Sequence, residues 1–130
     1  MASNQQKTPN AILLIEESEA FRLLYRTILK ALGVAKVVEA VDGISGYREY
    51  VMGQFDIVIM AYRLPRKSGL DTLREIRATR RDARIIMLTT ENDKKTVMEC
   101  IKAGARYYIQ KDLSARDLKK KLKEVFNLIL

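Results

Sequence analysis

The sequence predicts an α/β fold in which a doubly wound, five-stranded parallel sheet is covered by helices on both faces. Five short apolar runs alternate along the chain with five longer amphipathic segments, a pattern typical of parallel strands joined by helical crossovers. The short runs are apolar throughout rather than at every second position, as expected for strands buried on both faces. A chain of 130 residues, 48% hydrophobic and 31% charged, suits one such domain.

The first half of the chain predicts two strand–helix units. Ser18 is a suitable N-cap residue, and the apolar positions after it recur at helical spacing up to Gly33, a common helix stop. The second strand is less apolar than the others, so we expect it near an edge of the sheet. Gly53 closes the second helix. The predicted elements are the strand 11–15, the helix 19–32, the strand 35–40 and the helix 44–52.

The second half predicts three more units. Pro65 enforces a turn after the third strand. Asn92 is a suitable cap for the fourth helix, in which Val97 and Ile101 have the i,i+4 spacing of an inward face. Ser114, with an acidic residue three positions later, resembles a capping box. The predicted elements are the strand 55–60, the helix 70–80, the strand 84–88, a helix ending at Gly104, the strand 106–110 and a last helix that buries Leu118, Leu122, Val125 and Ile129.

Composition narrows the cellular setting and the chemistry. Cys100 is the only cysteine, so no internal disulfide can form, and a reducing cytoplasm is expected. The absence of histidine excludes imidazole ligands and Ser-His or Cys-His nucleophile pairs. No apolar stretch reaches the ~20 residues that span a bilayer, so no membrane association is predicted. Residues 1–10 are polar and are expected to be a flexible lead-in to one domain over residues 11–130.

The chain is basic, with a net charge of +8 at pH 7. This charge favours acidic partners, whether protein, nucleic acid or anionic lipid, although a solvated surface rich in lysine explains it more simply. The lysine-rich run 119–123 fits either the solvated face of a helix or part of a docking surface. No recognition motif such as a helix-turn-helix accompanies it, so nucleic-acid binding is not favoured.

Several chemically distinctive residues follow strands of the predicted sheet. Glu16 and Glu17 follow the first strand, Ala61 the third, Thr89 the fourth and Lys111 the fifth. The carboxyl ends of parallel strands share one edge, where such sheets place their ligands. An acidic pair could bind a hard cation, a lysine could neutralise an oxyanion, and a threonine hydroxyl could bond a phosphoryl oxygen. Ala61 has no charge, no nucleophile and no metal-binding atom.

Four ordered motifs resemble the receiver domains of two-component response regulators, of the chemotaxis-regulator type. They are the runs 12–18, 56–65 with 68–70, 85–89 and 103–111, and the resemblance covers about residues 11–129. It implies a flavodoxin-like (βα)5 fold with strand order 2-1-3-4-5. It also implies a phosphorelay signalling module that acts by protein–protein interaction and is not an enzyme.

The resemblance assigns a phosphorylation site and a metal site. In such domains an aspartate at the place of Ala61 accepts phosphate from a histidine kinase. Carried over, Mg²⁺ would be held by Glu17 as the better-placed ligand, by Glu16 in support and by the backbone carbonyl of Arg63. Ala61 cannot form an aspartyl phosphate, and glutamates replace the usual aspartates. Because Mg²⁺ demands near-ideal octahedral geometry, we expect its binding to be weak or lost.

The remaining assignments concern switching and partners. Thr89 and Lys111 correspond to residues that contact the phosphoryl group, and Thr89 and Tyr108 to the switch pair. Without its usual carboxylate partner, Lys111 could reach Glu16 or Glu17 instead. The implied partner face is formed by the fourth helix, fifth strand and fifth helix, with a cognate histidine kinase as one partner. Its basic residues are Lys94, Lys95, Lys102, Arg106, Lys119 and Lys123.

Asp112 stands where the family usually carries proline, and we expect a trans peptide before it, since a cis bond there costs ~2.5–4 kcal/mol.

Each of these assignments also has a simpler structural explanation. The glutamate pair could be solvent-facing acids at a helix start, Thr89 could cap or end an element, and Tyr108 could be ordinary packing. The leading hypothesis is a phosphorylation-independent pseudo-receiver, whether natural or made by substitution at Ala61. The alternatives are a nucleic-acid-binding basic face or a flavodoxin-like enzyme module. The enzyme lacks support, because the first strand ends Glu-Glu-Ser with no glycine-rich phosphate loop.

Overall fold

A computed structural model of the chain describes residues 6–130, so the first five residues of the predicted lead-in lie outside the described residues. The structure is a five-stranded parallel sheet in the order β2-β1-β3-β4-β5, as predicted. Strand β2 is at one edge, which confirms the expectation drawn from its lower apolar content. The strands are β1 (Ala11–Ile15), β2 (Lys36–Ala40), β3 (Ile57–Met60), β4 (Ile85–Thr89) and β5 (Tyr107–Gln110).

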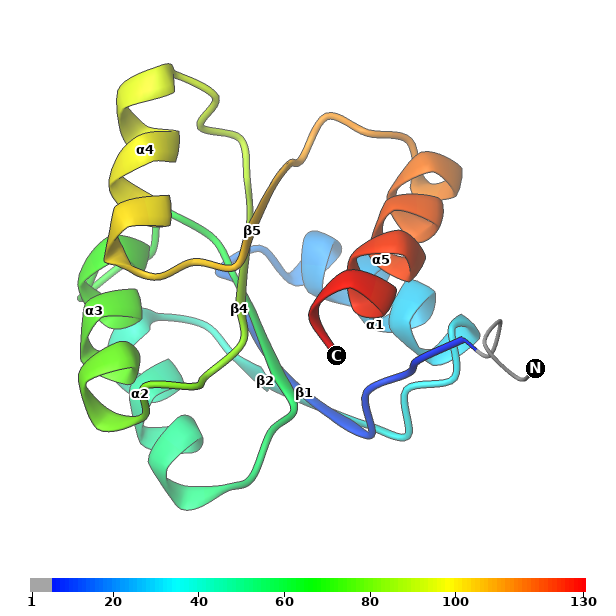
Figure 1. Cartoon of the computed structure of the whole chain (residues 1–130), viewed down its shortest axis with the longest axis horizontal. Helices are drawn as coiled ribbons and strands as arrows, with labels where there is room; N and C mark the ends of the chain where they lie inside the picture. The colour runs from blue at the N-terminus through cyan, green and yellow to red at the C-terminus, as the bar shows by residue number, and fades with distance from the viewer. Residues whose placement is uncertain (1–5) are drawn as a thin grey trace.

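Helices cover both faces of this sheet (Figure 1). One core cluster joins strand residues such as Ile12 and Ile86 to buried residues of α1 and α5, including Phe126. The opposite cluster joins Leu13 and Met87 to α2, α3 and α4. The predicted doubly wound architecture is therefore confirmed. The helices are α1 (Glu19–Ala31), α2 (Gly43–Met52), α3 (Gly69–Thr79), α4 (Lys94–Ala103) and α5 (Ala115–Ile129).

Each helix begins at a side-chain cap. Ser18, Ser68 and Ser114 accept hydrogen bonds from backbone N–H groups of α1, α3 and α5, as serine N-caps do. The cap of α4 is Asp93 rather than the predicted Asn92, and its carboxylate accepts from the Thr96 N–H at 3.0 Å. Asp42, which no sequence motif singled out, caps α2 in the same way. The boundaries therefore follow local capping chemistry to within one or two residues.

The buried face of α4 differs from the prediction. Thr96 and Cys100 point inward, whereas Val97 is only half-buried and Ile101 is 43% exposed. The expectation that Ile101 faces inward is wrong. Thr96 can be buried because its hydroxyl donates to the Asp93 carboxylate at 2.9 Å, so its polar atom is satisfied. The inward face of α4 is therefore shifted by about one residue from the face that its apolar residues predict.

The described part of the lead-in lies along α5. The Lys7 N–H donates to Asn127 Oδ1 at 2.9 Å, and the Gln6 amide donates to the Lys123 carbonyl at 3.2 Å. Thus residues 6 and 7 border the C-terminal half of α5. Within residues 6–130, no helix is both long and apolar enough to cross a membrane.

Candidate functional site at the carboxyl edge of the sheet

The strand ends bring most of the predicted site residues to one edge of the sheet. Glu16, Ala61 and Lys111 each directly follow a strand, and Thr89 is the last residue of β4. Backbone hydrogen bonds join these positions: the Ala61 N–H donates to Ile15 at 3.1 Å, and the Lys111 N–H donates to Thr89 at 2.9 Å. The parallel topology alone is sufficient to gather them, because every strand ends on the same side.

A buried ion pair crosses the site. Lys111 Nζ lies 2.6 Å from Glu16 Oε1, and the two side chains are only 9% and 5% exposed. The contact has the proximity of an ion pair without hydrogen-bond geometry, while Glu16 Oε2 accepts from the Ser18 N–H at 2.8 Å. Of the two partners the sequence left open for Lys111, the structure selects Glu16. Both carboxylate oxygens of Glu16 are therefore engaged inside the protein.

An aromatic ring of α1 covers the lysine of this ion pair, and a second ring stacks on the first. Lys111 Nζ lies 4.4 Å from the centre of the Phe21 ring, a distance suited to a cation–π interaction, and Phe21 stacks on Tyr25 at 5.6 Å. The Tyr25 hydroxyl is buried and has no hydrogen-bond partner among the described residues. Burial, reinforced by the charge of Glu16, raises the pKa of Tyr25. Sequence patterns could not indicate the contact of Phe21 with Lys111, because the two residues are far apart in the chain.

The two glutamates have different surroundings. Glu16 is buried and paired, whereas Glu17 is exposed and forms no ion pair within residues 6–130. In the same described range, no group of three or more acidic, histidine or cysteine side chains could hold a metal ion. The assignment of Mg²⁺ to Glu17, Glu16 and the Arg63 carbonyl thus stays a prediction.

Ala61 is itself enclosed. It is 3% exposed, and a Cβ atom added at Gly69 would lie 2.0 Å from its carbonyl oxygen. Only glycine allows the start of α3 to approach the residue this closely. Next to it, the Tyr62 N–H donates to the Thr89 hydroxyl at 3.1 Å. Thr89, which is 2% exposed, therefore ties the end of β4 to the loop after β3.

The loop between β4 and α4 is held at a second residue, Glu91. Its carbonyl accepts a hydrogen bond from the Tyr108 hydroxyl at 2.5 Å, and its carboxylate accepts from Arg63 Nε at 2.8 Å. Burial is the main cause that raises the pKa of Tyr108. The sequence analysis missed Glu91. The available signal was a carboxylate shortly after β4 that could pair with a cation such as Arg63, but no spacing motif marks this position.

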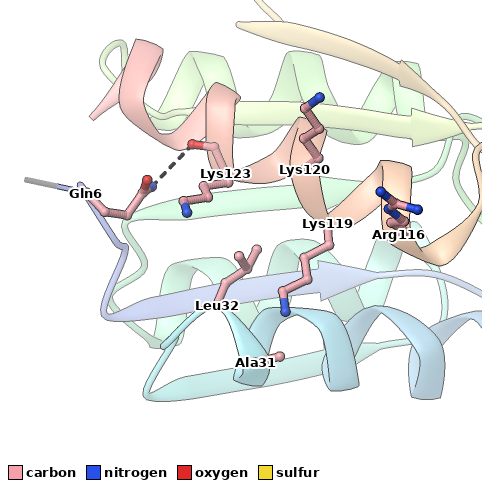
Figure 2. Close-up of a pocket in the computed structure, with 7 residues that line it drawn as sticks. All are labelled: Gln6, Ala31, Leu32, Arg116, Lys119, Lys120 and Lys123. Carbon is pink, nitrogen blue, oxygen red and sulfur yellow. Dashed lines mark hydrogen bonds between the residues drawn. The ribbon is translucent and has the colours of Figure 1, made fainter. Parts of the chain in front are cut away.

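The six basic residues assigned to one partner face divide between two surfaces. Lys94, Lys95 and Lys102 are exposed on α4, and Arg106 is exposed just before β5. Lys119 and Lys123, in contrast, border a cavity with Ala31 and Leu32 at the end of α1 (Figure 2). The two groups are on opposite faces of the sheet, because α4 packs on one face and α5 on the other.

Comparison with known proteins agrees with this architecture. The family described as "Response regulator receiver domain" matches residues 12–123. The chain belongs to the response regulator receiver domain family. It is 31% identical over 117 residues to the chemotaxis protein CheY-3 of Vibrio cholerae, covering 88% of this chain and 90% of that one. It is thus a CheY-like receiver domain of two-component signalling.

Solved structures show the same fold. A CheY-like receiver domain protein from Methanospirillum hungatei superimposes with a TM-score of 0.82 at 25% identity, covering 92% of this chain and 94% of that one. A CheX-CheY-BeF3-Mg²⁺ complex from Borrelia burgdorferi has a TM-score of 0.84 at 24% identity, covering 92% and 90%. The flavodoxin-like receiver fold extends over nearly the whole chain.

Proposed function

We propose that this receiver domain signals through protein contacts and is not phosphorylated at Ala61. The observation that carries the proposal is the buried alanine beyond β3, beside an ion pair in which Glu16 already neutralises Lys111. The family resemblance assigns a phosphoacceptor aspartate to this position. A methyl side chain has no oxygen to accept a phosphoryl group. Lys111, the lysine at this site, is already paired with the Glu16 carboxylate.

The contacts around Ala61 support a site that is closed without a phosphoryl group. The Thr89 hydroxyl accepts from the Tyr62 N–H, and the Tyr108 hydroxyl donates to Glu91. In our proposal these two residues, the pair assigned to switching, hold the β4–α4 loop in one arrangement. A domain of this kind presents a constant surface, and its output depends on its abundance and on its partners.

We further propose that Mg²⁺ binds weakly or not at all. The related complex from Borrelia burgdorferi contains Mg²⁺. In this chain Glu16 is engaged by Lys111 and the Ser18 N–H, which leaves the exposed Glu17 and the Arg63 carbonyl as free donors. Mg²⁺ requires near-ideal octahedral geometry and usually one or two carboxylates, so these donors fit it poorly. A Mg²⁺ titration followed by the amide resonances of Glu17 and Arg63 tests this point.

The partner face that we propose is on α4 and β5. Its cations are Lys94, Lys95, Lys102 and Arg106, all exposed. Between them, Met98 is 46% exposed and Ile101 43%. Exposed apolar side chains ringed by cations suit an acidic protein partner, and a cognate histidine kinase remains one candidate. The single buried cysteine is consistent with a reducing cytoplasm as the place of action.

Amide NMR spectra test whether the domain is silent to phosphodonors. We expect the spectrum of the chain in acetyl phosphate and Mg²⁺ to match that in Mg²⁺ alone. The matched variant is Ala61→Asp, in which a carboxylate returns to the edge of the sheet. In that variant we expect acetyl phosphate to shift the amides of Thr89, Glu91 and Tyr108. Donor-dependent shifts of the same amides in the unaltered chain would contradict the proposal.

A further inference from the structure

We infer that a groove between α1 and α5 binds an acidic segment of a partner protein that inserts an apolar side chain. This α1–α5 groove is lined by Gln6, Ala31, Leu32, Arg116, Lys119, Lys120 and Lys123 (Figure 2). It is on the opposite face of the sheet from α4, so it is separate from the proposed α4–β5 partner face. The inference therefore goes beyond the proposed function and can fail independently of it.

One wall of the groove is a continuous basic stripe. Arg116, Lys119, Lys120 and Lys123 have i, i+3, i+4, i+7 spacing, so they lie on one side of α5 over a length of about 10 Å. None of the four forms an ion pair within residues 6–130. The remaining residues, 1–5, contain no Asp or Glu. The stripe therefore remains a surface of net positive charge, although Asp117 and Glu124 lie beside Lys120 on the same helix.

The basic residues of the neighbouring helix α1 have structural partners, unlike those of the α5 stripe. On α1, both Arg22 and Arg26 pair with Glu39, and Lys30 donates to the Ala35 carbonyl at 2.7 Å. These cations are used to join α1 to β2. The side-chain cations of the α5 stripe make no such structural contact within residues 6–130. They border a groove rather than a convex surface. Concave surfaces with unpaired charge of one sign concentrate ligands of the opposite sign.

The other surfaces of the groove are apolar or already satisfied. Ala31 and Leu32, at the end of α1, form an aliphatic floor, and Leu32 packs partly against the core. Gln6 borders the groove, and its amide is bonded to the Lys123 carbonyl and to Asn127. The volume is about 470 Å³, enough for a few side chains. An aliphatic floor below a basic wall fits an apolar side chain flanked by carboxylates.

These features favour a peptide over nucleic acid or a second copy. Among the described residues, the lining has no aromatic side chain on which a base could stack, and stacking supplies much of the affinity for single strands. Self-association through this groove is disfavoured by the net charge of +8. An acidic protein segment uses both the cations and the aliphatic floor. It is the occupant to which we commit.

The test is a fluorescence-anisotropy titration with a designed peptide helix. The probe carries glutamates at i, i+3, i+4 and i+7 and one leucine between them. The paired reversals Lys119→Glu and Lys123→Glu should lower its affinity by at least about tenfold at ~50 mM NaCl. Arg48→Glu with Arg81→Glu makes the same change in net charge at two exposed positions that belong to neither basic surface. This control should lower the affinity by less than about threefold.

Further arms identify the occupant. Replacing the leucine of the probe by serine should weaken binding several-fold, and the intact probe should shift the Leu32 methyl resonances. Equal losses from the control and the α5 reversals, or no loss from the latter, would overturn the inference. A thymidine oligonucleotide of equal charge that binds more tightly than the peptide through Lys119 and Lys123 would also overturn it, in favour of a phosphate polymer. Thermal melts of both variants confirm that each is folded.

Discussion

The ion pair between Glu16 and Lys111 stabilises the domain only while both charges are present. Each side chain is almost fully buried, so each charge has lost most of its hydration and depends on the other. The ring of Phe21 covers the ammonium and excludes water from it. In our proposal this contact takes the place of a phosphoryl group as the partner of Lys111.

Removing Lys111 should therefore destabilise the fold. For Lys111→Ala we expect the free energy of unfolding to fall by about 2–4 kcal/mol, because Glu16 is left as an unpaired buried charge. The melting temperature should drop by roughly 6–15 °C. Lys111→Met combined with Glu16→Gln should recover much of the loss. The control Lys94→Ala, at an exposed position, should change the free energy by less than about 0.5 kcal/mol. An unchanged melting temperature in Lys111→Ala would refute the role assigned to the pair.

Cys100 is a second residue whose behaviour follows from burial. Its side chain is fully inaccessible, and burial raises the pKa of the thiol from its ordinary 9.0 to about 11. We expect no reaction with an aromatic disulfide reagent at pH 8 in the native state and complete reaction after unfolding. Between pH 9.0 and 11 the native state keeps a proton that the unfolded state releases, so stability should decline as pH rises. Rapid native-state labelling would contradict this description.

At the scale of elements, Arg77 joins α3 to the segment before β4 and to the end of α4. From α3, its guanidinium donates to the carbonyls of Ala83, before β4, and of Gly104, at the end of α4, both at 2.6 Å. Burial is the main cause that lowers the pKa of Arg77. Gly104 has φ +113°, and a Cβ there would lie 2.5 Å from Arg77 Nε. Glycine is thus required both by the left-handed turn and by this close approach.

Substitution of Arg77 should loosen the contact between α3 and α4. Arg77→Ala leaves the two partly buried carbonyls of Ala83 and Gly104 without this donor, and we expect a loss of about 1–2 kcal/mol in the free energy of unfolding. Arg77→Lys should recover less than half of it, because an ammonium cannot reproduce the planar, forked set of donors. Arg74→Ala is the matched control on the same helix, and its exposed side chain should matter little. Denaturant titration measures all three, and full recovery by lysine would contradict the account.

Most elements were predictable because their signals are local. Alternating apolar and amphipathic runs and serine caps indicated each helix and strand to within one or two residues. The face of α4 was not predictable from periodicity, since the Asp93–Thr96 hydrogen bond makes a threonine acceptable in the interior. The contacts of Arg77 were missed for a related reason. The bond to Gly104 joins residues 27 positions apart, and no sequence pattern signals it.

The candidate site was predictable in part for the same reason. Parallel topology is enough to gather Glu16, Ala61, Thr89 and Lys111 at one edge. It does not determine which glutamate meets Lys111. Glu16 extends the pairing of β1, since its N–H donates to Ala40 at 3.0 Å, and its side chain turns inward. Glu17, one residue later, is consequently exposed. Which glutamate turns inward depends on the residue at which the β1–β2 hydrogen-bond ladder ends, and sequence patterns do not determine that residue.

At the scale of the whole molecule, the sheet separates three features. Its carboxyl edge holds the Glu16–Lys111 site, α4 carries one basic and partly apolar surface, and the α1–α5 groove is a second basic surface on the other face. In our proposal, a domain with an unphosphorylated site and two separate basic surfaces is suited to contact with acidic protein partners. The net charge of +8 should speed such encounters and make their rates fall with salt.

The most direct measurement is intact-mass spectrometry after incubation with acetyl phosphate and Mg²⁺. We predict that the unaltered chain gains no phosphoryl group, because no side-chain oxygen is present at Ala61. We predict that Ala61→Asp gains one phosphoryl group, which would show that the surrounding pocket retains the ability to accept it. A phosphoryl adduct on the unaltered chain that maps to the carboxyl edge of the sheet would contradict the central claim.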